Sequence, residues 1–182
     1  MVCLLVTLGI SVQLVLMLVL TLALPLIPDL LADYTQVMDS LGSDSLVSSL
    51  TLVVGAPLAE EFCFRGVGMR LALRGTRRPW LACVIQALAF GAAHLNLVQG
   101  AYAFAIGILL GVVALRTGRL WTCVLLHASV NAASYLPDLL SLIPTSLYAA
   151  GLLFAGTLGL AGVAVGVRLL LQASYFESTG EA

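Results

Sequence analysis

The chain has 182 residues, of which 61% are hydrophobic and only 9% are charged, and its mean hydropathy is +1.10. This composition excludes an ordinary soluble domain and indicates an all-α protein that spans a membrane several times. The formal net charge of −1 gives no reason to expect a polyanion as a ligand. We therefore expect membrane lipid as a partner and no nucleic acid.

Windows free of charged residues predict about six membrane-spanning helices, each of roughly 20 residues. They cover approximately residues 2–27, 45–74, 79–96, 100–115, 120–136 and 146–168. Between the first two, an acidic loop is expected at 29–44, where proline and glycine act as breakers. The first helix lacks the basic start of a cleaved signal peptide, so we expect it to be retained. The whole chain, 1–182, is predicted to be one membrane domain.

The arginines and aspartates fall at opposite ends of these predicted spans. With six spans and a cytoplasmic N-terminus, the positive-inside rule is satisfied by nearly all basic residues, and the C-terminus is also cytoplasmic. We therefore expect a multi-pass protein of the cell membrane, namely the cytoplasmic membrane of a bacterium. The arginines on the cytoplasmic side are Arg70, Arg74, Arg77, Arg78, Arg116, Arg119 and Arg168.

Three polar motifs interrupt the apolar segments. Charged side chains cost about 2.5 to 3.5 kcal/mol each at a bilayer centre, so their presence there indicates function. Each motif contains two polar or aromatic residues that are four apart and share a helix face: Glu61 with Arg65, Phe90 with His94, and His127 with Asn131. Because polar groups in hydrocarbon need partners, we expect the motifs to meet in a core over residues 45–136. They are Glu60-Glu61-x-x-x-Arg65, Phe90-x-x-x-His94 and His127-x-x-x-Asn131.

The types of residue in these motifs indicate hydrolysis. Glu61 and Arg65 are expected to form a buried ion pair, which leaves Glu60 to face a polar cavity. A carboxylate and an imidazole can together remove a proton from water as the water attacks a carbonyl. A second imidazole and an amide can donate hydrogen bonds to the developing oxyanion. The set therefore fits cleavage of an amide bond without a nucleophilic side chain, and its alternative is a purely structural packing network.

Other readings of the same residues remain open. Glu60, His94 and His127 could hold a catalytic zinc ion, although we expect no metal or cofactor. The chain could also be a non-catalytic immunity or scaffold protein, or a small ion transporter. The cysteines lack metal-ligand or disulfide spacing and are predicted to be small buried hydrophobic residues, with Cys63 near a histidine as a further nucleophile to consider.

With its three motifs in this order, the chain resembles the CPBP family, also called the CAAX protease and bacteriocin-processing or Abi family. The similarity covers about residues 50–135 and includes the turn Arg116-Thr117-Gly118-Arg119. The family includes the eukaryotic Ras-converting CAAX endopeptidases and is regarded as one of glutamic proteases. The resemblance implies an intramembrane endopeptidase acting on membrane-associated peptides or proteins, lipidated or not.

The resemblance also implies a role for each motif residue. Glu60 is expected to be the general base that activates water, with assistance from His94. His127 and Asn131 are expected to form the oxyanion site. The resemblance implies structural support from the remaining motif residues, which are Glu61, Arg65 and Phe90.

Two details of the sequence bear on packing. If Trp80 and Trp121 lie at equal depth, His94 and His127 are about 12 Å apart along the membrane normal, which is too far for one catalytic centre. We therefore expect residues 74–78 to stand outside the membrane. Small residues repeat at a spacing of four in Gly107–Gly111 and in Gly162–Gly166. Such pairs mark close helix contacts, either within the chain or in a dimer, and we expect the former.

Overall fold

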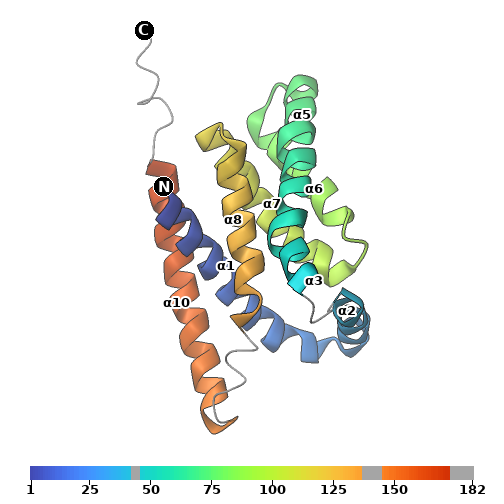
Figure 1. Cartoon of the computed structure of the whole chain (residues 1–182), viewed down its shortest axis with the longest axis vertical. Coiled ribbons are helices and arrows are strands. Elements are labelled where there is room, and N and C mark those ends of the chain that lie inside the picture. Colours follow the sequence, from blue (N-terminus) through green and yellow to red (C-terminus); the bar gives the residue numbers. More distant parts are fainter. Residues whose placement is uncertain (42–45, 137–144, 173–182) are drawn as a thin grey trace.

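The computed structural model describes residues 1–41, 46–136 and 145–172, and their regular structure is helical throughout, as predicted (Figure 1). The chain begins with α1 (Val2–Ala23), the short η1 (Leu24–Leu26) and α2 (Pro28–Leu41). The later helices are α6 (Pro79–Ala92), α7 (Leu97–Thr117), α8 (Leu120–Ala133) and α10 (Thr145–Gln172).

Residues Leu46–Thr76 form a continuous helix in which two π-helical stretches alternate with three α-helical ones. Two stretches are π-helical: in η2 the N–H of Ala56 bonds the carbonyl of Thr51, and in η3 the N–H of Met69 bonds that of Phe64. Turns of this kind occur frequently at functional sites. The five parts are α3 (Leu46–Leu50), η2 (Thr51–Gly55), α4 (Ala56–Glu61), η3 (Phe62–Gly68) and α5 (Met69–Thr76).

Four of the six predicted helices are long and apolar enough to cross a membrane. The other two, α6 and α8, have 14 residues each, or about 21 Å at 1.5 Å per residue. That length is shorter than the hydrocarbon core of roughly 30 Å. The candidate spans are Val2–Leu26, Leu46–Thr76, Leu97–Thr117 and Leu147–Gln172. Several spans therefore indicate a multi-pass membrane protein, while six crossings and cytoplasmic termini stay predictions.

The prediction of a loop at 29–44 is wrong over most of its length, because α2 extends from Pro28 to Leu41. Proline suits the first position of a helix. Leu30 and Tyr34 are four apart and partly buried, and the Tyr34 ring packs edge-to-face on Tyr102 of α7 with centroids 6.5 Å apart. Acidic residues and breakers masked this helical spacing. Residues 42–45, and the predicted break at 137–144, lie outside the described residues.

The small-residue pairs pack within the chain, as predicted. Helix α1 lies along α10 (Figure 1), and a Cβ placed on Gly166 would come within 2.9 Å of Leu8, while one on Gly162 would meet Ser11. On α7, a Cβ at Gly107 would lie 3.1 Å from Ala87 of α6. Both glycine pairs therefore allow two helices of the same chain to approach closely.

We predict that Gly111→Ala destabilises the protein by about 1 to 3 kcal/mol, the usual cost of overpacking. The added Cβ would meet Cys83 Sγ and lie 2.7 Å from Gln86 Nε2, both on α6. Thermal unfolding of the purified protein in detergent measures the effect. The matched control is Gly151→Ala on α10, where nothing lies within 4 Å of the new atom. Equal midpoints for the two variants would contradict the packing described here.

Candidate active site

Glu61 is at the centre of the polar cluster, and its side chain is completely buried. Its Oε1 accepts a hydrogen bond of 2.9 Å from Nη1 of Arg65, the ion pair that the sequence predicts. The same oxygen lies 2.8 Å from Nδ1 of His127 on α8. One carboxylate oxygen therefore joins α4, η3 and α8, and the second contact was not predicted.

Arg65 makes two further contacts that fix its guanidinium group. Its Nη2 donates a hydrogen bond of 3.3 Å to the carbonyl of Gly107 on α7. Its Cζ lies 4.4 Å from the centroid of the Phe90 ring on α6, within the range of a cation–π contact. The guanidinium group thus connects the helix that carries the glutamates to both α6 and α7.

His127 lies between the two glutamates of the first motif. Because an ionised carboxylate only accepts hydrogen bonds, the contact with Glu61 requires a proton on Nδ1 of His127. The other ring nitrogen, Nε2, lies 3.7 Å from Oε2 of Glu60. The Glu60 side chain is 33% exposed, whereas that of His127 is 7% exposed. Glu60 is therefore the accessible carboxylate of the pair, and Glu61 orients the imidazole behind it.

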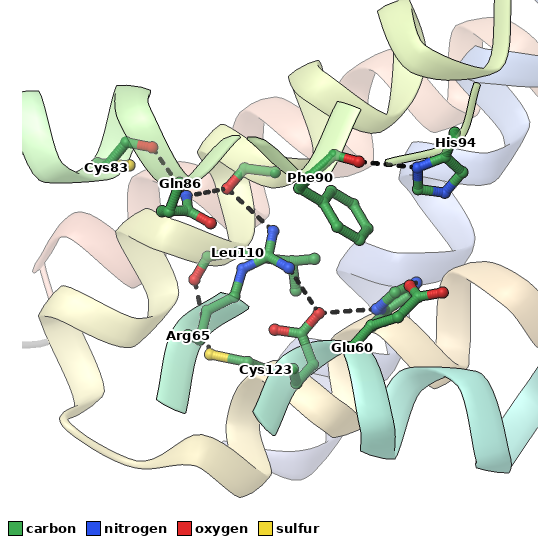
Figure 2. Close-up of polar contacts among 11 residues, drawn as sticks. Glu60, Arg65, Cys83, Gln86, Phe90, His94, Leu110 and Cys123 are labelled. Carbon is green, nitrogen blue, oxygen red and sulfur yellow. Dashed lines mark hydrogen bonds and ion pairs between the residues drawn. The ribbon is translucent and has the colours of Figure 1, made fainter. Parts of the chain in front are cut away.

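The Phe90 ring brings the two histidines to the same place. His94 packs edge-on against it with a centroid distance of 4.9 Å, and His127 does so at 5.7 Å. Figure 2 shows Glu60 and His94 on one side of this ring and Arg65 on the other. The sequence predicts that the two histidines differ in depth, yet both contact the Phe90 ring. The end of α5, which precedes α6, lies higher in the view of Figure 1 than the start of α8, so the two shorter helices do not begin at the same level.

His94 follows the end of α6 and turns back toward it. Its Nδ1 lies 2.9 Å from the carbonyl of Phe90, and because a carbonyl only accepts, Nδ1 carries the proton. In a neutral imidazole this leaves Nε2 with a free lone pair. The turn is possible because Gly91 and Gly100 allow α6 and α7 to touch: a Cβ on Gly91 would lie 2.6 Å from the Gly100 carbonyl.

Asn131 has a structural partner that the sequence analysis missed. Its Nδ2 donates a hydrogen bond of 2.9 Å to the carbonyl of Leu52 in η2. With π-helical bonding, that carbonyl would pair with the N–H of Pro57, which proline lacks. The amide therefore replaces a missing backbone donor. An Asn amide carries two N–H donors, so a second remains for a ligand.

Gln86 is the buried polar residue of the cluster that the motif analysis overlooked. It is 2% exposed, and its Nε2 donates to the carbonyls of Cys83 at 2.8 Å and Gly107 at 2.9 Å. Gly107 therefore accepts from both Gln86 and Arg65 (Figure 2). The sequence feature that could have identified Gln86 is its position, four residues before Phe90 on an otherwise apolar helix.

The zinc alternative and the predicted burial of the cysteines can also be compared with the structure. Across the described ranges, no group of three His, Cys, Asp or Glu residues could hold a metal ion. The zinc alternative for Glu60, His94 and His127 thus gains no support from the geometry. Burial of the cysteines is confirmed for two and wrong for two, because Cys83 and Cys123 are buried while Cys3 and Cys63 are exposed.

Fold and site together define a helical membrane protein with a glutamate–histidine–arginine cluster between short and long helices. The sequence profile described as type II CAAX prenyl endopeptidase Rce1-like matches residues 42–133. The chain belongs to this family of peptidases, which confirms the resemblance seen in the sequence. All three motifs lie within the matched residues.

One curated protein and no solved structure match the chain. The relative, described as an uncharacterized 24.3 kDa protein of Escherichia coli, is 35% identical over 97 residues. The alignment covers 51% of this chain and 45% of the relative, so the chain spans less than half the length of that protein.

We predict that Arg65→Met destabilises the protein by about 3 to 5 kcal/mol, because it leaves the buried Glu61 carboxylate without its cation. The double variant Glu61→Gln/Arg65→Met should recover much of this loss, since neither charge is then left alone. Chemical or thermal unfolding in detergent measures both. Additive effects of the two substitutions would contradict the coupling described here.

A second cycle tests the structural contact of Asn131. Asn131→Ala should cost about 1 to 3 kcal/mol in the natural background, because the Leu52 carbonyl loses its donor. In a Pro57→Ala background the restored N–H can bond that carbonyl, so the cost should fall. Unfolding measurements on the four proteins give the coupling energy. An unchanged cost in the second background would show that Asn131 does not compensate for the proline.

Proposed function

We propose that the protein is an intramembrane endopeptidase in which Glu60 activates water for attack on a peptide bond. The family supplies the reaction class, since its members are peptidases. The observation that carries the proposal is the pairing of Glu60 with a histidine that a second carboxylate orients. Ionisable residues within membrane spans are costly, so the retention of Glu60 in an apolar helical bundle favours a chemical role.

The first step is proton transfer from water. Glu60 is the accessible carboxylate, and Nε2 of His94 offers a lone pair because Nδ1 is engaged by the Phe90 carbonyl. A water held by these two groups loses a proton to Glu60 as its oxygen bonds the substrate carbonyl carbon. Glu60 then returns the proton to the amide nitrogen as the C–N bond breaks.

The second requirement is stabilisation of the oxyanion that forms in this attack. When His127 carries a proton on Nε2 as well as Nδ1, it donates toward the substrate while Glu61 holds its Nδ1 in place. The second amide N–H of Asn131 is a further donor, because the first is engaged by Leu52. His94 thus acts as an acceptor and His127 as a donor, a division supported by their different hydrogen-bond partners.

Membrane-associated peptides or proteins are the proposed substrates, with a prenylated C-terminal tail as the first to examine because of the family name. Substrates would reach Glu60 from the lipid phase or its surface, since the cluster lies among candidate membrane spans. No specific sequence is proposed.

Glu60→Gln is expected to lower the cleavage rate by about 10² to 10⁴ while leaving the fold intact, because the amide cannot accept a proton from water. Purified protein in detergent would be incubated with quenched peptides, lipidated and unmodified, with and without a chelator. Arg70→Gln, which changes an exposed charged residue ten positions further along the same continuous helix, is the matched control and should retain full activity.

The outcomes of this experiment separate the mechanisms. Cleavage that resists the chelator and disappears in Glu60→Gln supports glutamate-activated water. Cleavage that the chelator abolishes would indicate that the same residues act together with a bound metal ion. Full activity of Glu60→Gln would refute the role proposed for this carboxylate.

A further inference from the structure

A second, separate feature of the molecule is an apolar pocket of about 630 Å³ between α1, α2 and α7. Its volume is within the range of small-molecule sites. None of its lining residues belongs to the cluster around Glu61, and its sole side chain with a polar atom is Tyr102. The mechanism proposed above makes no use of this pocket.

The residues that line the pocket extend along two helical segments of the chain. The lining extends from Val12 on α1 to Leu24 at the start of η1, and on α7 from Leu97 to Leu109. Each interval is about 18 Å at 1.5 Å per residue. One leaflet of a bilayer whose hydrocarbon core measures roughly 30 Å is about 15 Å thick. The pocket therefore matches the length of one lipid acyl chain.

Small side chains on α7 create the space. Ala101 and Ala105 are four apart, share a helix face and both line the pocket. Both are exposed in the absence of lipid. Larger residues at these two positions would fill the pocket without disturbing the packed interface of α7 with α6, which lies at Gly107 and Gly111.

One end of the pocket is bounded by α2, which lies outside the candidate membrane spans. Ile27 and Leu30 line this end, and the exposed Asp29 lies between them in the sequence. Asp33, one turn further, is also exposed. No basic residue precedes Arg65 in the chain. The two exposed aspartates give this end of the pocket a local negative charge, which attracts an ammonium group and repels a net-anionic headgroup.

We propose that the pocket binds one acyl chain of a bilayer phospholipid whose headgroup carries an ammonium group, held near Asp29. The hydrocarbon lining selects the chain, and the aspartates select the headgroup. The lipid joins α2 to α1 and α7, so its binding stabilises the folded protein by mass action. This site does not depend on the proposed peptidase activity.

Native mass spectrometry of the delipidated full chain tests the proposal with phosphatidylethanolamine and phosphatidylglycerol as probes. Wild-type protein should bind one phosphatidylethanolamine in preference to phosphatidylglycerol. Ala105→Phe should weaken that binding about tenfold or more, a loss of roughly 1.4 kcal/mol per tenfold. Ala161→Phe, at an exposed position on α10 about 200° around the helix from the pocket residue Val163, is the matched control and should bind normally.

Asp29→Asn tests the headgroup and should remove the preference for phosphatidylethanolamine while keeping the binding of one lipid. Equal losses in Ala105→Phe and Ala161→Phe would overturn the pocket as the site. Equal binding of the two lipids by the wild type would overturn the role of the aspartates. Stoichiometric displacement of the lipid by a farnesylated peptide would overturn the assignment to a bilayer lipid and give the pocket to a substrate.

Discussion

The arrangement of the active-site cluster depends on a single oxygen atom, Oε1 of Glu61, which accepts from both Arg65 and His127. In a buried position, one carboxylate with two donors loses its hydration but gains two charge-assisted contacts. Removing Arg65 would leave the charge of Glu61 without its cation in an apolar interior, and removing His127 would take away a hydrogen-bond donor. The helix that carries the glutamates, α8 and, through the guanidinium group, α6 and α7 are therefore held in one mutual orientation.

Arginine is suited to this position in a way that lysine is not. Arg65 uses Nη1 for Glu61, Nη2 for the Gly107 carbonyl and the face of its guanidinium group for the Phe90 ring. An ammonium group has no planar face and no fixed fork of donors. The same ring contacts both histidines, so Phe90 conveys the position of the arginine to the residues that would contact substrate.

Much of the helical framework could be predicted from the sequence, because charge-free windows and a spacing of four are local properties. The pairing of Glu61 with Arg65 is of this kind. Which histidine meets which glutamate is not local: the contact of His127 with Glu61 joins residues 66 positions apart. The contact of Asn131 depends on a missing N–H at Pro57, which becomes visible only when the backbone pattern of η2 is known.

The errors also have physical causes. Helix α2 was missed because the exposed Asp29 and Asp33 obscure the amphipathic spacing of Leu30 and Tyr34. Gln86 was overlooked because a single amide in an apolar helix has no motif, although its burial needs partners from another helix.

The two π-helical stretches on either side of α4 have a consequence for how such a protein can diverge. Each such turn accommodates one residue more than an α-helix does, and one residue corresponds to about 100° of rotation. The glutamate segment is therefore offset in register from α3 before it and α5 after it. Loss of the extra residue from either stretch would rotate the adjoining helix by about 100° relative to the two carboxylates, so a deletion there would turn that helix's surface toward different neighbours.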